Sequence, residues 1–145
     1  MNDAIANHHG LVGALGAGLP GLLLQFVMCL VLLAVGVAIY TAATPFRERE
    51  LLRQGNVAAA TLLAGAVVAL AFPLAALLAT TSSYLDIAVW GTVAIVLQLL
   101  TVIVLSHSLR GMMRMIEAGQ VAAALPIVAA QLAVGLLNAA TMVPV

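Results

Sequence analysis

Four uninterrupted apolar stretches, each close to the length of a membrane-crossing helix, constrain this chain more than any other feature. They lie at about 21–43, 57–80, 88–107 and 121–143. A helix needs roughly 20 predominantly apolar residues to cross the hydrocarbon core of a bilayer. The pattern predicts an all-α, polytopic membrane protein with four transmembrane helices over 21–145, preceded by an N-terminal tail over 1–20.

Composition excludes a water-soluble globule. Of the 145 residues, 65% are hydrophobic and 7% are charged, whereas soluble domains carry about a quarter of charged residues. The lipid bilayer is therefore the expected surrounding of most of the surface. The five basic residues are arginines interleaved with glutamates, which is too little positive charge for a nucleic-acid partner.

The arginines predict the orientation of the helices. All of them fall in the first and third connections, whereas the second connection has Asp86 as its only charge. Short loops that carry arginine are retained on the cytoplasmic side. Both termini and the second connection are then expected in the periplasm of a bacterium, with the protein in the inner membrane. The first seven residues carry no positive charge, so we expect no cleaved signal peptide.

The two arginine-containing connections also carry signals for local structure. A short surface helix is one interpretation of each, although the sequence alone leaves open whether they are helical. Gly55 and Gly119 are placed to end such helices, and Asn56 is suited to cap the next span.

An internal repeat is predicted from the residues that follow the two arginine-containing connections. Aligning Gly55 with Gly119 places the run Val-Ala-Ala-Ala at 57–60 on the identical run at 121–124. The offset covers two spans, so the two halves would be parallel-repeat helical hairpins with the same orientation. The alternative is that any two alanine-rich helices align.

Small residues are concentrated in the second and fourth stretches. Gly65 and Ala69 have the small-xxx-small spacing, as do Ala129 and Ala133. Such faces let helices approach closely in lipid. We expect these two spans to pack closely, against each other or across the interface of a homo-oligomer.

Four amide side chains lie inside the apolar stretches: Gln25, Gln98, Gln131 and Asn138. These side chains either form hydrogen bonds between helices or line a polar path through the membrane. Transporters and proton relays generally use ionisable groups at depth, and none is expected there in this chain. Hydrogen bonding between helices is therefore the favoured interpretation.

The charged connections supply a candidate docking surface for anionic lipid or a cytoplasmic protein. Its residues are Arg47, Arg49, Glu50, Arg53, Arg110 and Arg114. The alternative, that these charges only fix topology, is equally weighted. His8 and His9 lack acidic or thiol partners at metal-ligand spacing, so neither a metal nor a cofactor is expected.

Motifs of known enzyme classes are absent from the sequence. It contains no Gly-x-Ser-x-Gly, no His-Glu-x-x-His, no phosphate-binding loop and no paired carboxylates at one depth. A non-enzymatic protein is expected.

A family resemblance covers about 21–143. It is carried by Arg-Gln-Gly-Asn-x-Ala-Ala-Ala at 53–60, by Phe-Pro-Leu at 72–74, by Gln98 and by Gly-Leu-Leu-Asn-Ala-Ala at 135–140. In these runs the chain resembles the YjfL-like family of small bacterial inner-membrane proteins, a domain of unknown function numbered 350. The resemblance implies four spans, and genes encoding phage-shock-type stress proteins and ATP-grasp ligases as neighbours.

Two functional hypotheses follow. In the first, the protein is an oligomeric scaffold whose charged connections recruit a cytoplasmic stress-response or ATP-grasp partner during envelope stress. In the second, it is a small channel or transporter subunit, as the repeat, the buried amides and the in-span Pro73 and Pro126 suggest.

Overall fold

The computed structural model describes residues 2–44 and 48–143, with side-chain placement from residue 16 onward. Every element in these ranges is a helix, which confirms the all-α prediction. In chain order they are α1 (Asn2–Ala43), α2 (Glu48–Arg53), α3 (Val57–Thr80), α4 (Tyr84–Ser108), α5 (Arg110–Glu117) and α6 (Val121–Thr141).

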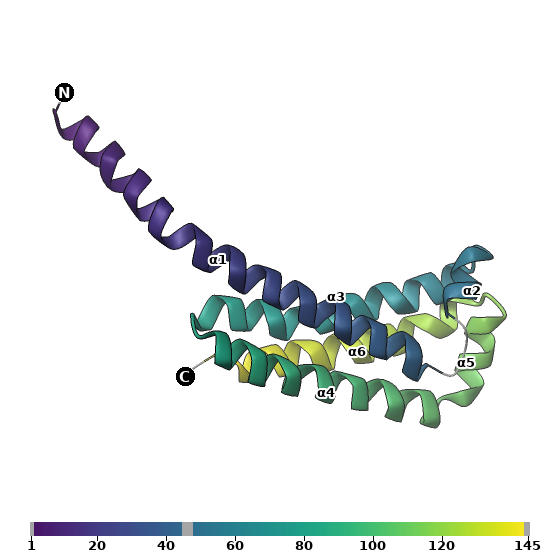
Figure 1. The fold of residues 1–145 in the computed structure, drawn as a ribbon. Helices are drawn as coiled ribbons and strands as arrows, with labels where there is room; N and C mark the ends of the chain where they lie inside the picture. Colours follow the sequence, from purple (N-terminus) through teal and green to yellow (C-terminus); the bar gives the residue numbers. More distant parts are fainter. Residues whose placement is uncertain (1, 45–47, 144–145) are drawn as a thin grey trace.

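Four of these helices are long and apolar enough to cross a membrane, as the four apolar stretches predicted. The crossing segments are Gly16–Ala43, Val57–Thr80, Tyr84–Ser108 and Val121–Thr141. α1 continues without interruption back to Asn2, and its N-terminal part projects away from the other helices (Figure 1). The N-terminal tail and the first span therefore form one helix.

The short helices α2 and α5 lie together at one end of the bundle, and the C-terminus lies at the other (Figure 1). Each is followed by a glycine in the left-handed region, Gly55 at φ 76° and Gly119 at φ 85°. Glycine adopts this conformation without steric cost, which is why it ends helices. Both arginine-containing connections therefore contain a short helix, α2 in the first and α5 in the third.

α3 and α6 form the most closely packed pair, which confirms the packing predicted from their small residues. A Cβ atom built on Gly135 would lie 2.6 Å from the backbone oxygen of Ala69, and one on Gly65 would lie 2.6 Å from Cγ1 of Val128. Neither position has room for a side chain, so the two backbones approach as closely as glycine allows.

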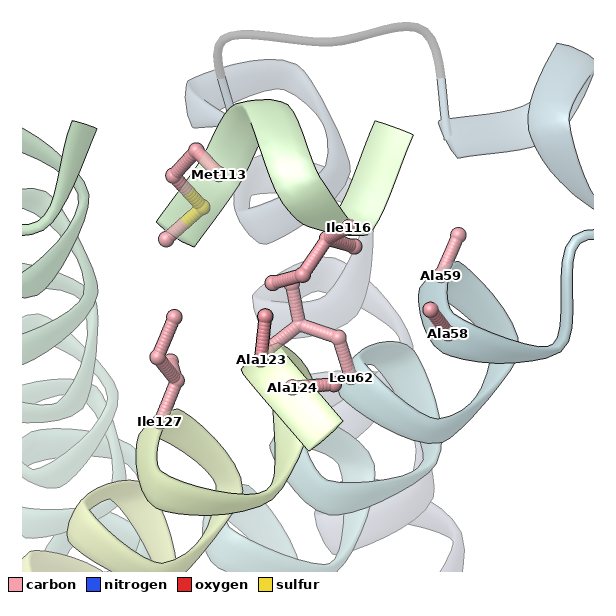
Figure 2. Close-up of a cluster of buried hydrophobic side chains, with 8 residues drawn as sticks. All are labelled: Ala58, Ala59, Leu62, Met113, Ile116, Ala123, Ala124 and Ile127. Atoms are coloured by element: carbon pink, nitrogen blue, oxygen red, sulfur yellow. The ribbon is translucent and has the colours of Figure 1, made fainter. Parts of the chain in front are cut away.

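α5 closes the end of this pair. Its face with Met113 and Ile116 is buried, whereas Arg110 and Arg114 are exposed. Figure 2 shows both apolar side chains pointing toward the starts of α3 and α6, in a cluster with Ala58, Ala59, Leu62, Ala123, Ala124 and Ile127. Burial of this cluster fixes α5 across the helix ends.

α1 and α4 complete the bundle. α1 packs against both α3 and α4, and large apolar side chains such as Leu22, Val31 and Val96 stay exposed. An exposed apolar surface of this extent is expected where lipid is the solvent. Each half of the chain runs through a long helix, a short helix and a long helix, and the duplication of one half from the other stays a prediction.

Candidate functional site: a buried column of acceptor oxygens

The buried side-chain oxygens and nitrogens that lack a hydrogen-bond partner within the protein belong to five residues of the described chain. Their unpartnered atoms are the hydroxyl of Tyr40, both carboxylate oxygens of Glu48, and one side-chain amide oxygen each of Gln98, Gln131 and Asn138. All of these atoms are oxygens able to accept a hydrogen bond. Unsatisfied buried polar groups are uncommon in proteins and each requires an explanation. We call these five residues the polar column.

Glu48 forms one end of the column, at the end of the bundle where α2 and α5 lie. It opens α2 and is only 2% exposed, although its neighbours Arg49 and Glu50 are exposed. Residues three and four apart share one face of a helix. Glu48 therefore shares the inward face of α2 with Leu51 and Leu52, which are half-buried.

Tyr40 links Glu48 to the interior of the bundle. It is fully buried in the last turns of α1 and packs with Ala66 of α3 and Val102 of α4. Its hydroxyl lies beside the Glu48 carboxylate on one side and beside the side chain of Gln131 on the other. Neither approach meets the geometric criteria of a hydrogen bond, so the hydroxyl remains without a partner in the protein.

The burial of Glu48 changes its acid–base behaviour. Removal from water penalises the charged carboxylate and raises the pKa of Glu48 to about 7, although the nearby hydroxyls of Tyr40 and Thr44 lower it in part. The side chain therefore exchanges its proton near neutral pH. Carboxyl groups tuned in this way are concentrated at functional sites.

Gln98 and Gln131 form the middle of the column, on the facing helices α4 and α6. The Gln98 Nε2 donates to the backbone oxygen of Gln131 at 3.0 Å. Each residue is 1% exposed, and both side-chain carbonyl oxygens are left without a partner. The amide nitrogen of Gln98 thus ties the two helices together, whereas the carbonyl oxygens remain available to another donor.

Asn138 continues the column toward the opposite end. Its Nδ2 donates to the backbone oxygen of Ala94 at 3.1 Å, and Oδ1 has no partner. Ala94 lies one helical turn before Gln98, and Asn138 lies two turns beyond Gln131, about 10 Å along α6. On α6 the column therefore runs from the middle of the helix at Gln131 to Asn138, near its C-terminal end.

Gln25, the fourth predicted intramembrane amide, lies outside the column. Its Nε2 donates at 2.7 Å to the backbone oxygen of Ser82 in the connection between α3 and α4. It joins α1 to that connection at the end of the bundle opposite α2, and none of its atoms is among the unpartnered ones.

The column has the chemistry to bind a hydrogen-bond donor or a cation. Its unpartnered oxygens attract protons, water or a monovalent cation. Within the described residues, no group of three His, Cys, Asp or Glu side chains is placed to hold a metal ion.

The predicted docking residues lie at the same end as Glu48. Arg49, Glu50 and Arg53 are exposed on α2, and Arg110 and Arg114 are exposed on α5. Arg47 lies outside the described residues. The two sets line separate hollows, one beside α1 and the other beside the end of α4.

Sequence reasoning missed Glu48 and Tyr40. It treated Glu48 as part of an exposed charged connection, and it expected no ionisable group in the interior. The structure corrects this expectation, because α2 folds back so that its first residue is buried against Tyr40. The spacing of Glu48 from Leu51 and Leu52 is the sequence signal that could have placed it on a buried face.

Comparison with known proteins gives one match. The model of the family described as Domain of Unknown Function (DUF350) matches residues 14–142. No curated protein and no solved structure matches the chain. The matched range includes the four membrane-length helices and all five residues of the polar column.

Proposed function

The chain belongs to the DUF350 family, and we propose that it acts as a small, non-enzymatic membrane transport protein that carries protons through the polar column. One observation carries the proposal. The buried side-chain polar atoms left without a partner in the described chain are all oxygens. Tyr40 lies near both Glu48 and Gln131, Gln98 is bonded to Gln131, and Asn138 is bonded to α4 one turn before Gln98. A column held only for structural reasons would be expected to satisfy its own acceptors.

Each residue of the column has a defined part in proton movement. Glu48 takes up or releases a proton at the end that bears α2 and α5. The Tyr40 hydroxyl, which both donates and accepts, stands between Glu48 and Gln131. The amide oxygens of Gln131, Gln98 and Asn138 accept hydrogen bonds from water, and water is needed to bridge the two turns between Gln131 and Asn138.

Flux into proteoliposomes tests the proposal. The purified chain is reconstituted into liposomes that contain a pH-sensitive dye, and a potassium diffusion potential drives proton entry. We expect proton uptake above that of empty liposomes. Replacement of Gln131 by leucine removes one acceptor at similar volume and should reduce the uptake at least tenfold.

A matched variant separates the column from general damage to the bundle. Gln25→Leu removes a buried amide of the same type that lies outside the column, and it should leave the uptake close to wild type. Equal loss in both variants, or uptake no faster than in empty liposomes, would contradict the proposal. Selective movement of sodium or potassium without protons would assign the column to another cation.

A second candidate function rests on the exposed arginines. Arg49, Arg53, Arg110 and Arg114 are all exposed at one end of the bundle. The orientation with this end in the cytoplasm and both termini in the periplasm of a bacterial inner membrane remains part of the proposal. There the arginines would recruit a cytoplasmic stress-response or ATP-grasp partner to an oligomeric scaffold.

Co-purification with candidate partners tests the scaffold. Partner retention should fall when Arg110 and Arg114 are both replaced by glutamate, and it should persist in Gln131→Leu, which leaves the surface unchanged. Retention unaffected by these two changes would exclude the arginines of α5 as the docking site.

A further inference from the structure

A groove on the outside of the bundle runs between α1 and α3 and reaches α2. Its walls are apolar side chains of the two long helices, and it ends beside Glu48 and Arg49; the volume is about 610 Å³. A second hollow of about 450 Å³ continues from that end, and its charged lining consists of Glu48, Arg49, Glu50 and Arg53. The two hollows share Ala38, Thr41, Glu48 and Arg49, so they form one groove with an apolar length and an end that carries two arginines beside two glutamates.

We propose that this groove binds one anionic phospholipid, with an acyl chain between α1 and α3 and the phosphate held by Arg49 and Arg53. The proposal does not depend on proton transport, because it rests on the outer surface and not on the polar column.

The dimensions of the groove fit an acyl chain. On α1 the lining extends from Leu30 to Thr41, which is about 16 Å of helix at 1.5 Å per residue. One leaflet provides about half of the roughly 30 Å hydrocarbon core. The apolar part of this lining ends at Ala38, about 12 Å from Leu30, so it covers most of the thickness of one leaflet. Its half-buried residues Leu33, Val37, Leu63 and Val67 offer only hydrocarbon contact.

The charge at the end of the groove fits a phosphate. Arg49 and Arg53 are exposed and four residues apart on α2, so both guanidinium groups can reach one anion. Glu50 lines the same hollow, but its Oε1 accepts from Nε2 of Gln54 at 3.0 Å, so that oxygen is already partnered. Basic pockets between transmembrane helices are known binding sites for anionic head groups.

α5 provides a matched control at the same end of the bundle. Arg110 and Arg114 are also exposed and four residues apart, but the hollow that they line lies beside α4 and the end of α1 at Ala43. A general attraction of arginine for anionic lipid would act equally at both helices. Binding at a specific site should instead depend on Arg49 and Arg53 and not on Arg110 and Arg114.

Native mass spectrometry of the full-length chain, with phosphatidylglycerol or phosphatidylethanolamine added in detergent, tests this site. We expect one phosphatidylglycerol molecule to be retained in preference to phosphatidylethanolamine. Arg49→Gln and Arg53→Gln should each weaken the binding about fivefold, whereas Arg110→Gln and Arg114→Gln should leave it unchanged. Glycerol phosphate without acyl chains should not compete, because the apolar groove contributes to binding.

A substitution that fills the groove checks the acyl-chain position. Val37→Trp should displace the lipid, and Val96→Trp on the exposed face of α4 should not; the melting temperature of each variant shows whether it is folded. Equal binding of both lipids, equal loss from the α2 and α5 arginine variants, or full retention in Val37→Trp would overturn the proposal. Retention of a protein in place of lipid at Arg49 and Arg53 would also overturn it.

Discussion

At the scale of single residues, the burial of Glu48 is the feature that separates this bundle from a purely apolar one. The carboxyl group lies against Tyr40 at the end of α1, and both of its oxygens lack a partner. An ionised carboxylate in such surroundings costs several kcal/mol, so the group is held neutral up to a higher pH than in water.

The pKa of Glu48 predicts how stability depends on pH. The folded protein keeps the proton up to about pH 7, whereas a glutamate in the unfolded chain loses it near 4.5. The folded state therefore binds more protons between these values, and the free energy of unfolding falls as the pH rises from about 4.5 to about 7. The contribution of Glu48 to this fall is at most about 3 kcal/mol.

Thermal unfolding in detergent at a series of pH values checks this prediction. Glu48→Gln should lose most of the decline seen in wild type over this window. Glu50→Gln, which changes an exposed carboxyl on the same helix, should keep the wild-type decline. A Glu48→Gln profile parallel to wild type would show that Glu48 does not titrate in this range.

At the residue scale, the sequence was sufficient to find the polar side chains inside the spans, but it was not sufficient to show that Glu48 and Tyr40 are buried. The amides Gln25, Gln98, Gln131 and Asn138 were found because polar groups stand out inside apolar runs. Glu48 was missed because its burial depends on the direction in which α2 leaves α1, which is a tertiary property. Tyr40 was missed because a tyrosine near the end of a span is usually interfacial.

At the scale of helices, one side chain adds hydrogen bonds to the apolar contact between α5 and α3. Asn56 caps α3 by accepting from the Ala59 backbone N–H at 3.0 Å, and its Nδ2 donates to the backbone oxygens of Ile116 and Glu117 at 3.0 and 3.1 Å. Asn56 thus provides hydrogen-bond partners for a backbone N–H at the start of α3 and for two backbone oxygens at the end of α5.

Replacement of Asn56 by alanine should lower the free energy of unfolding by about 1–3 kcal/mol, since both the cap and the bonds to α5 are lost. Gln120 holds the same position before α6 but makes no side-chain cap bond, so Gln120→Ala should cost clearly less. Chemical unfolding curves of the two variants provide the comparison. Similar losses would mean that the bonds of Asn56 contribute little.

The contact between α3 and α6 leads to a second helix-scale prediction. Gly135→Ala would bring a methyl group within 2.6 Å of the Ala69 backbone oxygen, and a backbone atom cannot move aside without shifting α3. We expect a loss of about 1–3 kcal/mol from this overpacking.

Gly111→Ala is the control for this substitution, because an added Cβ meets no atom within 4 Å there. Alanine favours a helix more than glycine does, so the stability of this variant should stay unchanged or rise slightly. Unfolding measurements on both variants decide the question. A Gly135→Ala variant as stable as wild type would show that α3 and α6 have room to separate.

Helix-scale features were the most predictable from sequence. The four spans, the close approach of α3 and α6, the glycines that end α2 and α5, and the Asn56 cap all follow from local chemistry. The bonds from Asn56 to α5 could not be predicted, because they join residues about 60 positions apart in the chain.

At the scale of the whole molecule, sequence patterns predicted the class of fold, and the family match confirms the resemblance to a domain of unknown function. The order in which the helices pack could not be predicted, because apolar faces in lipid give little directional signal. The column emerges only when α1, α2, α4 and α6 are placed together, since each contributes one or two of its residues.

Proton flux through proteoliposomes that contain either wild type or Glu48→Gln tests the central claim most directly. The polar column needs a group that exchanges protons near neutral pH at its end, and glutamine cannot do so. We predict dye-detected proton uptake with wild type and at least a tenfold slower rate with Glu48→Gln at equal reconstitution. The same rate in both proteins would contradict the assignment of the column as a proton path.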